Sequence, residues 1–572
     1  MPIDLWTTHS LDKVFPDSGK PPRASQSISL KAARNETEDA QVALRIPRDV
    51  EIAQASFSLP HLIGPDRRRI SRRNLDAWWI WYTYVLENPP ANKDPASYLR
   101  KAPAFFPDAF LEEKKIAIRD EWTQPLWVSV SIPKGTPAGD YKGTMAIDLV
   151  AKSGEKHHFE VPMTVTVWPF TLPDKPHLHH TEWFEAGVIA DYYHVERWSE
   201  QHWTWLERIA ADMASHKQDM ILTPFSSLVQ VKRAKTGRFS YDFSRLDRWV
   251  KTFRKAGVDW IEGGHVAGRT GDFQSDIVWR RFPVYARDGK QIDTSLDKLS
   301  EREFEPYVEH LLKAVFAHMK RRGWHKQYAQ HIADEPIPEN EESWCHRARK
   351  VREWLPGVPI IDAVMSSGLE GLVDWRVPQI QHTGPEVPRG PNEELWSYVC
   401  LAPQGQYPNR FLDYPSIRNR IIFWLSWSLG LKGFLHWGYA FWVRWQGVPV
   451  NVPVSPWLDA TGASIYCADR TPLPAGDPHI VYPGRNSICS SIRWEVIRKG
   501  FEDFEYLYLL ERAVASAGKR ARGRAASAAR KLLARVRSEM APDPLGHTRS
   551  EELLLGAREE AGKLLAMLAA EE

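Results

Sequence analysis

The spacing of apolar residues changes near residue 171, and this change limits the possible folds more than any other feature of the chain. Upstream of it, apolar and polar residues alternate over short segments that end at turns, namely 41–46, 125–132, 141–150 and 159–168. Alternation with a period of two, interrupted by closely spaced turns, is typical of a β-sandwich. We therefore predict a β-sandwich over residues 1–170, followed by a proline-stiffened linker over 171–177.

From residue 178 onwards, helical and strand patterns alternate. Apolar residues at three- and four-residue spacing predict helices over 199–216, 243–255, 303–322, 341–354 and 417–429. Short apolar segments between them predict strands over 220–224, 258–263, 327–333, 359–365, 397–401 and 433–438. Such alternation over about 300 residues predicts a (β/α)8 barrel, here assigned to 178–510. A doubly wound open sheet is the alternative, although no GxGxxG motif follows a strand.

The segment 511–572 is rich in Ala, Arg, Lys, Glu and Leu, and its basic runs are followed by acidic ones. We predict a C-terminal helical extension with a solvated charged face rather than a nucleic-acid binding element. The whole chain has 75 Lys and Arg against 72 Asp and Glu, a net charge of +3, so it lacks the basic excess of a dedicated nucleic-acid binder. Its hydrophobic content of 43% excludes a largely disordered chain.

The sequence carries no recognisable signature of a metal, a cofactor or a membrane span. Because the cysteines form no CxxC pair, we expect neither a zinc site nor a disulfide framework. No phosphate-binding loop is present, and we expect no cofactor. The chain opens without a basic segment followed by an apolar run, and no apolar run reaches the roughly 18 residues of a membrane span. We therefore expect a cytoplasmic protein that does not enter a membrane.

Tryptophan is unusually frequent, with 26 residues in 572. The flat indole ring stacks well against the apolar C–H face of a sugar, so this content favours a protein that handles carbohydrate. The most informative aromatic residues come just past predicted strand ends, where barrel enzymes bind substrate, and they are Trp183, Trp437, Tyr439 and Trp442. Core packing explains each of them equally well, and both interpretations stay open.

Two adjacent carboxylates, Asp334 and Glu335, end an apolar strand just before Pro336. Side chains at the carboxyl ends of barrel strands face the active site. Two carboxylates held close in a partly dry pocket repel each other, so one of them keeps its proton to a higher pH. The pair therefore predicts a general acid beside an ionised stabiliser, with an exposed turn of ordinary solvated acids as the alternative.

Other candidate site residues lie on neighbouring strands. Glu182 ends the first predicted strand, Glu262 ends the third, and His265 lies in the long connection 263–299 that follows it. Long connections in a compact domain are often functional, and this one is a candidate for shaping specificity towards the leaving group, with a lid or an ordinary surface loop as the alternatives. If Glu262 lay opposite Glu335, an ordinary two-carboxylate glycosidase would remain possible.

Several motifs occur in an order that resembles one known family. They are Asp334-Glu335-Pro336, the segment 396–413, the strand 433–438 and the run 491–507, preceded near the N-terminus by Asn35-Glu36 and the segment 137–143. Together they make the chain similar to family 123 of the glycoside hydrolases and to the uncharacterised domain family related to it. The likeness extends to about residue 510 and leaves out the helical extension.

The resemblance implies a β-N-acetylgalactosaminidase that works by a retaining, substrate-assisted mechanism, in which the 2-acetamido group of the sugar is the nucleophile. Carried onto this sequence, Glu335 would be the general acid and base, and Asp334 would orient the acetamido N–H. Tyr398 is a candidate donor to the acetamido oxygen. The expected partner is an oligosaccharide or glycoconjugate that ends in an N-acetylhexosamine. A glycosidase of other specificity and a catalytically silent sugar-binding protein are the alternatives.

Overall fold

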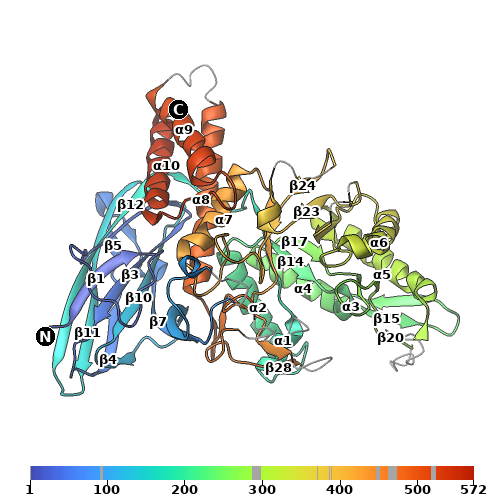
Figure 1. Cartoon of the computed structure of the whole chain (residues 1–572), viewed down its shortest axis with the longest axis horizontal. Helices are drawn as coiled ribbons and strands as arrows, with labels where there is room; N and C mark the ends of the chain where they lie inside the picture. The colour runs from blue at the N-terminus through green and yellow to red at the C-terminus, as the bar shows by residue number, and fades with distance from the viewer. Residues whose placement is uncertain are drawn as a thin grey trace. The chain divides into compact units, whose positions relative to one another are not determined.

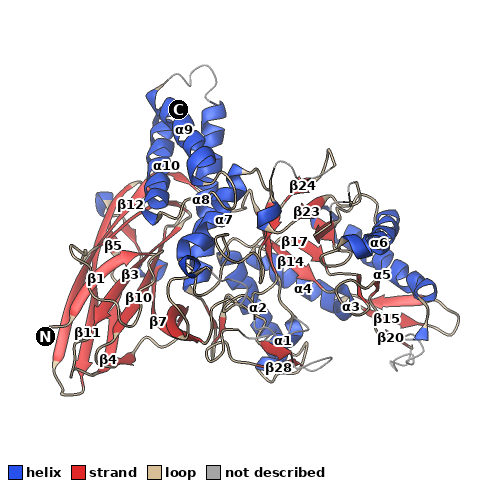
Figure 2. Ribbon diagram, in the orientation of Figure 1, coloured by secondary structure: helices blue, strands red, loops and turns tan. Residues whose placement is uncertain are grey.

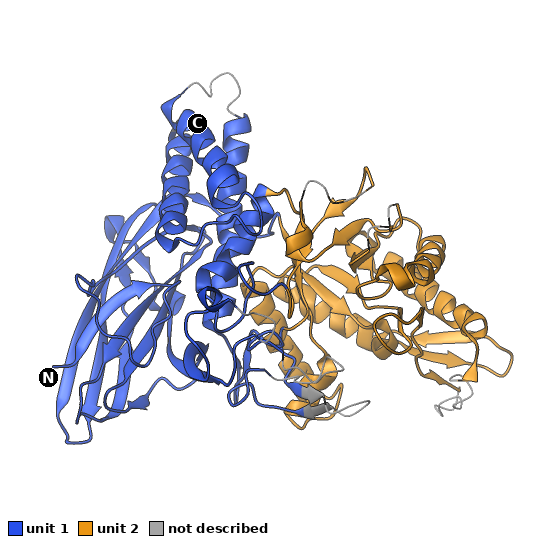
Figure 3. Cartoon of the chain, in the orientation of Figure 1, with its two compact units in different colours: residues 1–177, 403–428, 439–572 blue, residues 178–402, 429–438 orange. Residues whose placement is uncertain are grey.

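The computed structural model of the chain divides into two compact units (Figure 3). Unit 1 comprises residues 1–177, 403–428 and 439–572, and unit 2 comprises 178–402 and 429–438. The structure describes residues 2–89, 94–286, 298–366, 368–369, 371–384, 387, 390–445, 451–461, 473–516 and 523–571. The units interleave along the sequence, so the predicted domain boundaries at 170, 177 and 510 stay a prediction.

Two β-sheets build the N-terminal part of unit 1 (Figure 1). The five-stranded sheet has the order β1 (Asp4–His9), β3 (Thr37–Arg45), β10 (Thr123–Ser131), β7 (Leu75–Val85) and β8 (Ala104–Phe110). The seven-stranded sheet contains β2 (Ile28–Arg34), β12 (Lys156–Thr171), β11 (Gly139–Ala151), β4 (Ile52–Ser58), β9 (Ile116–Ile118), β5 (Leu62–Ile63) and β6 (Arg69–Ile70). The described pairs are antiparallel, except that β2 runs parallel to β12.

One hydrophobic core lies between these two sheets. Val42 and Leu126 from the five-stranded sheet and Ile147 and Val165 from the seven-stranded sheet are fully buried in the same cluster. All four lie in segments where the sequence alternates with a period of two, and in β11 and β12 the buried residues alternate in the same way, whereas β3 and β10 are buried on both faces. This two-layered packing accounts for the alternation that predicts a β-sandwich.

The helices of unit 1 come from the second half of the chain. They are α7 (Ser416–Ser428), α8 (Ile492–Ser516), α9 (Arg524–Arg535) and α10 (Glu551–Glu571). Pairs of short strands lie among them, β27 (Val443–Trp445) with β28 (Asn451–Pro453), and β29 (Tyr482–Pro483) with β30 (Ile488–Cys489). No helix in the described part of the chain is long and apolar enough to cross a membrane.

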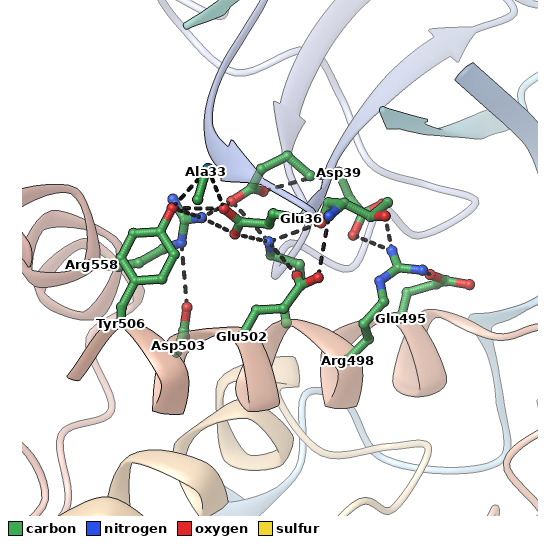
Figure 4. A network of polar contacts seen from close by, with 12 residues as sticks. Ala33, Glu36, Asp39, Glu495, Arg498, Glu502, Asp503, Tyr506 and Arg558 are labelled. Carbon is green, nitrogen blue, oxygen red and sulfur yellow. Dashed lines mark hydrogen bonds and ion pairs between the residues drawn. The ribbon is translucent and has the colours of Figure 1, made fainter. Parts of the chain in front are cut away.

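A buried ion network joins the first sheet to the C-terminal helices of unit 1 (Figure 4). Glu36, in the turn before β3, accepts from Tyr506 of α8 at 2.7 Å and pairs with Lys499 of α8 at 2.9 Å and with Arg558 of α10. Arg558 also lies 3.3 Å from Asp503. Buried charges are costly unless they are paired, and the Arg558 side chain is both buried and paired. This network therefore packs α10 against α8 and the turn before β3. The extension predicted to be solvated therefore carries a buried arginine.

Unit 2 alternates strands and helices (Figure 2). In the described part of this unit, parallel ladders include the strands β13 (His179–Glu182), β14 (Met220–Thr223), β17 (Trp260–Gly263), β21 (Tyr328–Gln330), β22 (Ile361–Ala363), β23 (Trp375–Val377), β25 (Ser397–Tyr398) and β26 (Gly433–His436). The helices are α1 (Ala186–Tyr192), α2 (Glu200–Ser215), α3 (Phe225–Leu228), α4 (Ser244–Ala256), α5 (Glu301–Arg322) and α6 (Glu341–Trp354). The helix predicted over 341–354 is thus confirmed to the residue.

Parallel pairing follows the order of these strands along the chain. Three runs pair as regular ladders, β14-β17-β21, β22-β23 and β25-β26-β13. Single bridges continue the pairing, from Gln330 to Ile360 and from Gln379 to Tyr398. Asp219, just before β14, bonds to His180 of β13 through its amide at 3.3 Å and its carboxylate at 2.8 Å.

These strands also share one core. Its buried apolar residues come from successive strands, namely Met220, Ala329, Ile361, Ala363, Trp375, Val377, Trp396, Tyr398 and Leu435, with Trp183 and Trp260 packed against them. Strand β23 escapes prediction because it is three residues long and carries Arg376 at its centre. Small additional strands, β15 (Gln230–Arg233), β16 (Phe239–Asp242), β20 (Val284–Tyr285) and β24 (Glu394–Leu395), lie in the connections.

Helix ends in unit 2 follow the sequence signals. Gly257 and Gly323 adopt the left-handed conformation directly after α4 and α5, with φ values of 115° and 74°. Ser300 and Glu303 form a reciprocal capping box at the start of α5. Because these residue types satisfy the backbone groups that a helix end leaves unpaired, they fix where each helix stops and the next strand begins.

Candidate active site

The Asp334-Glu335 pair lies shortly after β21 (Tyr328–Gln330), where the chain no longer pairs as a strand. The amides of Ile332 and Ala333 donate to the carboxylate of Asp362 in β22, at 3.1 and 3.2 Å, instead of to the backbone of a neighbouring strand. The strand predicted over 327–333 therefore ends at Gln330. Asp334 and Glu335 come next and are both half-buried. The side chain of Asp362 thus fixes the segment that delivers the two carboxylates.

Glu335 has a left-handed backbone, with a φ of 47°. Residues with a side chain rarely adopt this conformation, which costs about 1–3 kcal/mol and persists where the surroundings impose it. Here the Glu335 amide donates to the carbonyl of Ala363 at 3.0 Å, and the Arg269 guanidinium donates to the carbonyl of Glu335. The backbone of Glu335 is therefore held on both sides.

The surroundings of Asp334 and Glu335 raise the pKa of both carboxyl groups. Burial raises the pKa of Glu335, although hydrogen bonds from Tyr398 and Gln379 and the charge of Arg269 oppose this effect. Burial, and then the neighbouring charge of Glu335, raise the pKa of Asp334 to about 7. Because two adjacent carboxylates titrate as a unit, the pair retains one proton near neutrality.

His331 lies between two buried carboxylates next to this pair. Its Nε2 is 2.5 Å from Oε1 of Glu262, and its Nδ1 is 2.6 Å from Oδ1 of Asp362. Burial alone lowers the pKa of His331, but the bonds to Asp362 and Glu262 prevail and raise it to about 9. With both ring nitrogens donating, His331 is an imidazolium at neutral pH.

Glu262 is surrounded by hydrogen-bond donors. Its carboxylate accepts from the Thr181 hydroxyl, from the indole N–H of Trp183 at 2.8 Å, and from His331. The side chain is fully buried. In this arrangement Glu262 balances the charge of His331, and its oxygens point towards these three donors.

His265 packs beside His331, with their ring centroids 4.6 Å apart. Its Nε2 lies 3.9 Å from Oδ1 of Asp362. Burial and the charge of His331 hold the pKa of His265 well below its usual value, so this ring is neutral. One ligand atom each from His265, His331 and Asp362 lie within 4.8 Å of one another, close enough to hold a metal ion. However, His331 and Asp362 already bond to each other and to further groups, which favours an ion-pair network.

The structure places the remaining predicted residues as follows. Glu182 is fully buried, with His180 at 3.5 Å and His436 at 3.9 Å from its oxygens. Trp183 is half-buried and meets the rings of His265 and His331 edge to face. Trp437 is half-buried directly after β26.

Tyr398, predicted to contact the substrate, donates its hydroxyl to Glu335. Tyr439 and Trp442 belong to unit 1, where the indole N–H of Trp442 donates to Val481 at 3.1 Å and Tyr439 packs on Trp494. A sugar-binding role for these residues stays a prediction.

Sequence reasoning points to the segments that hold His331 and Arg269, namely the strand 327–333 and the connection 263–299, without giving either residue a role, and it leaves out Asp362 and Gln379. Asp362 does carry a signal, because it is a carboxylate inside an otherwise apolar strand, where charged groups need a partner. His331 has the same signal in the preceding strand. Arg269 carries only the signal of its place in the long connection 263–299, and Gln379 carries none, since their roles depend on contacts with residues far away along the chain.

Half-buried adjacent carboxylates with raised pKa values, in a segment that follows a parallel strand and contacts Tyr398, fit the acid–base chemistry of a glycosidase. Comparison with known families supports this class. Residues 183–510 match the glycoside hydrolase 123 catalytic domain, and residues 10–149 match the glycoside hydrolase 123 N-terminal domain. The chain belongs to glycoside hydrolase family 123.

Solved structures add a likeness of fold. A family 123 glycoside hydrolase from Clostridium perfringens, described in connection with glycolipid glycan hydrolysis, matches with a TM-score of 0.71 and 14% identity, covering 100% of this chain and 98% of that one. A PapD-like domain of human CEP192 matches with a TM-score of 0.16 and 12% identity, covering 26% of this chain and 92% of that one, a score too low to carry an argument. Among curated proteins, no match was found.

Proposed function

We propose that this glycoside hydrolase removes terminal β-linked N-acetylgalactosamine by substrate-assisted catalysis with retention of configuration. One observation carries the proposal: Asp334 and Glu335 are adjacent, half-buried and arranged so that the pair retains one proton near neutral pH. Such a pair supplies a general acid and an ionised stabiliser from a single strand end.

In the first step, the carbonyl oxygen of the 2-acetamido group attacks the anomeric carbon while Glu335 gives its proton to the departing glycosidic oxygen. The carboxylate of Asp334 accepts a hydrogen bond from the acetamido N–H and stabilises the positive charge of the oxazolinium. In the second step, Glu335 takes a proton from water, which attacks the anomeric carbon and reopens the oxazoline ring. Two displacements at one carbon give net retention.

Substrate assistance suits this site because the carboxylate considered as a separate protein nucleophile, Glu262, is already bonded by other groups. A retaining glycosidase with its own nucleophile places two carboxyl groups about 5–5.5 Å apart across the scissile bond. Glu262 was the candidate for that second group. Its carboxylate is buried and bonded by Thr181, Trp183 and His331, which supports a role in charge balance instead.

We further propose that the eight parallel strands of unit 2 close into a (β/α)8 barrel with Asp334 and Glu335 at its carboxyl end. The sequential parallel pairing and the single shared core support this proposal. The proposed substrate is a glycan that ends in N-acetylhexosamine. The glycolipid glycan named for the similar structure from Clostridium perfringens is one such candidate.

A panel of aryl β-glycosides of N-acetylgalactosamine, N-acetylglucosamine, galactose and glucose tests the proposal. We expect turnover of the acetamido sugars alone, fastest with N-acetylgalactosamine. Turnover of plain galactoside would contradict substrate assistance. Binding of N-acetylgalactosamine without turnover of any member would instead indicate a silent sugar-binding protein.

A further inference from the structure

A small β-hairpin is fixed against the segment that carries the proposed acid. Its strands are β18 (Ala267–Arg269) and β19 (Ile277–Trp279), in the long connection whose role the sequence leaves open. The amide of Ala267 donates to the carbonyl of Ile332 at 2.9 Å, two residues before Asp334. The amide of Ile277 donates to the Ser343 hydroxyl at 3.0 Å.

The tip of this hairpin is held as well. The side-chain amide of Asn340, shortly after Glu335, donates to the carbonyls of Phe273 at 3.2 Å and Ser275 at 3.3 Å. Contacts at its base and its tip therefore tie the hairpin to the chain segments on both sides of the carboxylate pair. These hydrogen bonds fix the position of the hairpin beside the carboxylate pair.

Arg269 connects the hairpin tip directly to Glu335. Its guanidinium lies over the Phe273 ring, 3.9 Å from the centroid, and its Nε donates to the Phe273 carbonyl at 3.0 Å. Another nitrogen of the same guanidinium donates to the main-chain carbonyl of Glu335. The Arg269 guanidinium thus contacts both the Phe273 ring and the main chain of Glu335, the residue proposed to protonate the leaving group.

Phe273 remains 46% exposed despite these contacts. The other large apolar side chain of unit 2 with comparable exposure in the described part of the chain is Met365, at 47%. Its amide donates to the carbonyl of Pro336 at 3.2 Å, so it too adjoins the carboxylate pair. Exposed apolar side chains that gather beside polar groups can mark a ligand-binding surface, and these two adjoin the same carboxylate pair.

We propose that Phe273, supported by Arg269, is the platform on which the leaving saccharide rests. This inference rests on the proposed role of Glu335 as the general acid. The acid must reach the glycosidic oxygen, so the sugar attached through that oxygen lies on the same side as Glu335. A phenyl ring offers a flat apolar surface for the C–H face of a pyranose. The guanidinium beneath keeps the ring in place and adds N–H donors at its edge.

The test compares two substrates with Phe273→Ala. One is a disaccharide with N-acetylgalactosamine β-linked to a hexose, and the other is N-acetylgalactosaminyl β-fluoride, which has no leaving sugar. We expect kcat/KM for the disaccharide to fall about tenfold, the range of one aromatic contact, and kcat/KM for the fluoride to stay within about twofold. Phe273→Tyr keeps a flat ring and should restore at least half of the disaccharide activity.

Leu458→Ala serves as the matched control, because this side chain is 83% exposed in unit 1, and it should affect neither substrate. Equal losses on both substrates, or no loss on either, would overturn the platform while leaving the proposed function intact. If the unmodified protein hydrolyses neither substrate, the proposed function fails, and the platform falls with it.

Discussion

The guanidinium of Arg269 donates a hydrogen bond to the main-chain carbonyl of Glu335, whose own backbone has a φ of 47°. A strained glutamate is therefore held by a residue that lies 66 positions earlier in the chain. Strain of this kind is found where the surroundings impose a functional geometry. The contact gives Arg269 two effects on Glu335, one on the position of its backbone and one on the charge near its carboxylate.

Replacing Arg269 with Met should lower kcat more than it changes KM. The Glu335 carbonyl loses its partner, and a displaced catalytic group costs on the order of 100-fold in rate. Because Arg269 lowers the pKa of Asp334 and Glu335, both limbs of the pH profile should move to higher pH. Steady-state kinetics between pH 4 and 9 measure both effects. Arg281 lies in the same connection and packs its guanidinium on Phe304 of α5, so Arg281→Met should leave the profile unchanged.

Glu335→Gln should abolish hydrolysis of substrates with poor leaving groups, since these require the proton of the acid. An activated leaving group, such as dinitrophenolate, should retain measurable turnover. Asp334→Asn should in addition lose inhibition by a thiazoline that mimics the oxazoline, because its carboxylate holds the acetamido N–H in the proposed mechanism. Unchanged hydrolysis of an alkyl glycoside by Glu335→Gln would contradict the assignment.

His331→Gln should shift the acidic limb of the kcat/KM profile to higher pH. The positive charge of His331 lowers the pKa of Asp334, so its removal raises that pKa further, and Asp334 must be ionised to act. As the pH is lowered, kcat/KM should therefore begin to fall at a higher pH than it does in the unmodified protein. His318→Gln is a suitable control, since His318 forms a comparable 2.6 Å pair with Asp247 between α4 and α5. An unmoved limb would show that His331 has no influence on the pair.

Arg558→Met should lower the free energy of unfolding by about 3–5 kcal/mol, as expected when one member of a buried ion network is removed. Glu36 would keep Lys499 but lose its second cation. Urea unfolding followed by circular dichroism measures the change. Arg535→Met removes an exposed 2.7 Å pair with Glu560 and should cost no more than about 0.5 kcal/mol. Equal losses for the two variants would indicate that the network adds nothing to stability.

Local patterns in the sequence predict many elements of this fold. The helix over 341–354 is correct at both ends, and the helices predicted to end at 255 and 322 end at Ala256 and Arg322. These elements depend on the spacing of residues within a few turns. Strand β23 is missed because a three-residue strand with a central Arg376 has too few apolar residues to show a period.

The candidate site divides in the same way. Asp334 and Glu335 are found because they adjoin each other in the sequence. The bonds that tune them join residues far apart, such as His331 with Glu262, 69 positions away. The left-handed backbone of Glu335 has no sequence signal either, because the residue that usually adopts it is glycine. Such features become visible only when the strands are brought together.

The ion network around Glu36 has a consequence for the order in which the chain is made. Arg558 follows Glu36 by 522 residues, and Lys499 follows it by 463. At about 5–20 residues per second, a ribosome needs roughly half a minute to two minutes to cover the longer interval. Until Lys499 has been made, the nascent first sheet carries a carboxylate with neither of its buried cations, and until Arg558 follows it has only one of them. Completion of this sheet's charge balance is therefore a late event of synthesis, and a chain interrupted before α10 would pair Glu36 with Lys499 alone.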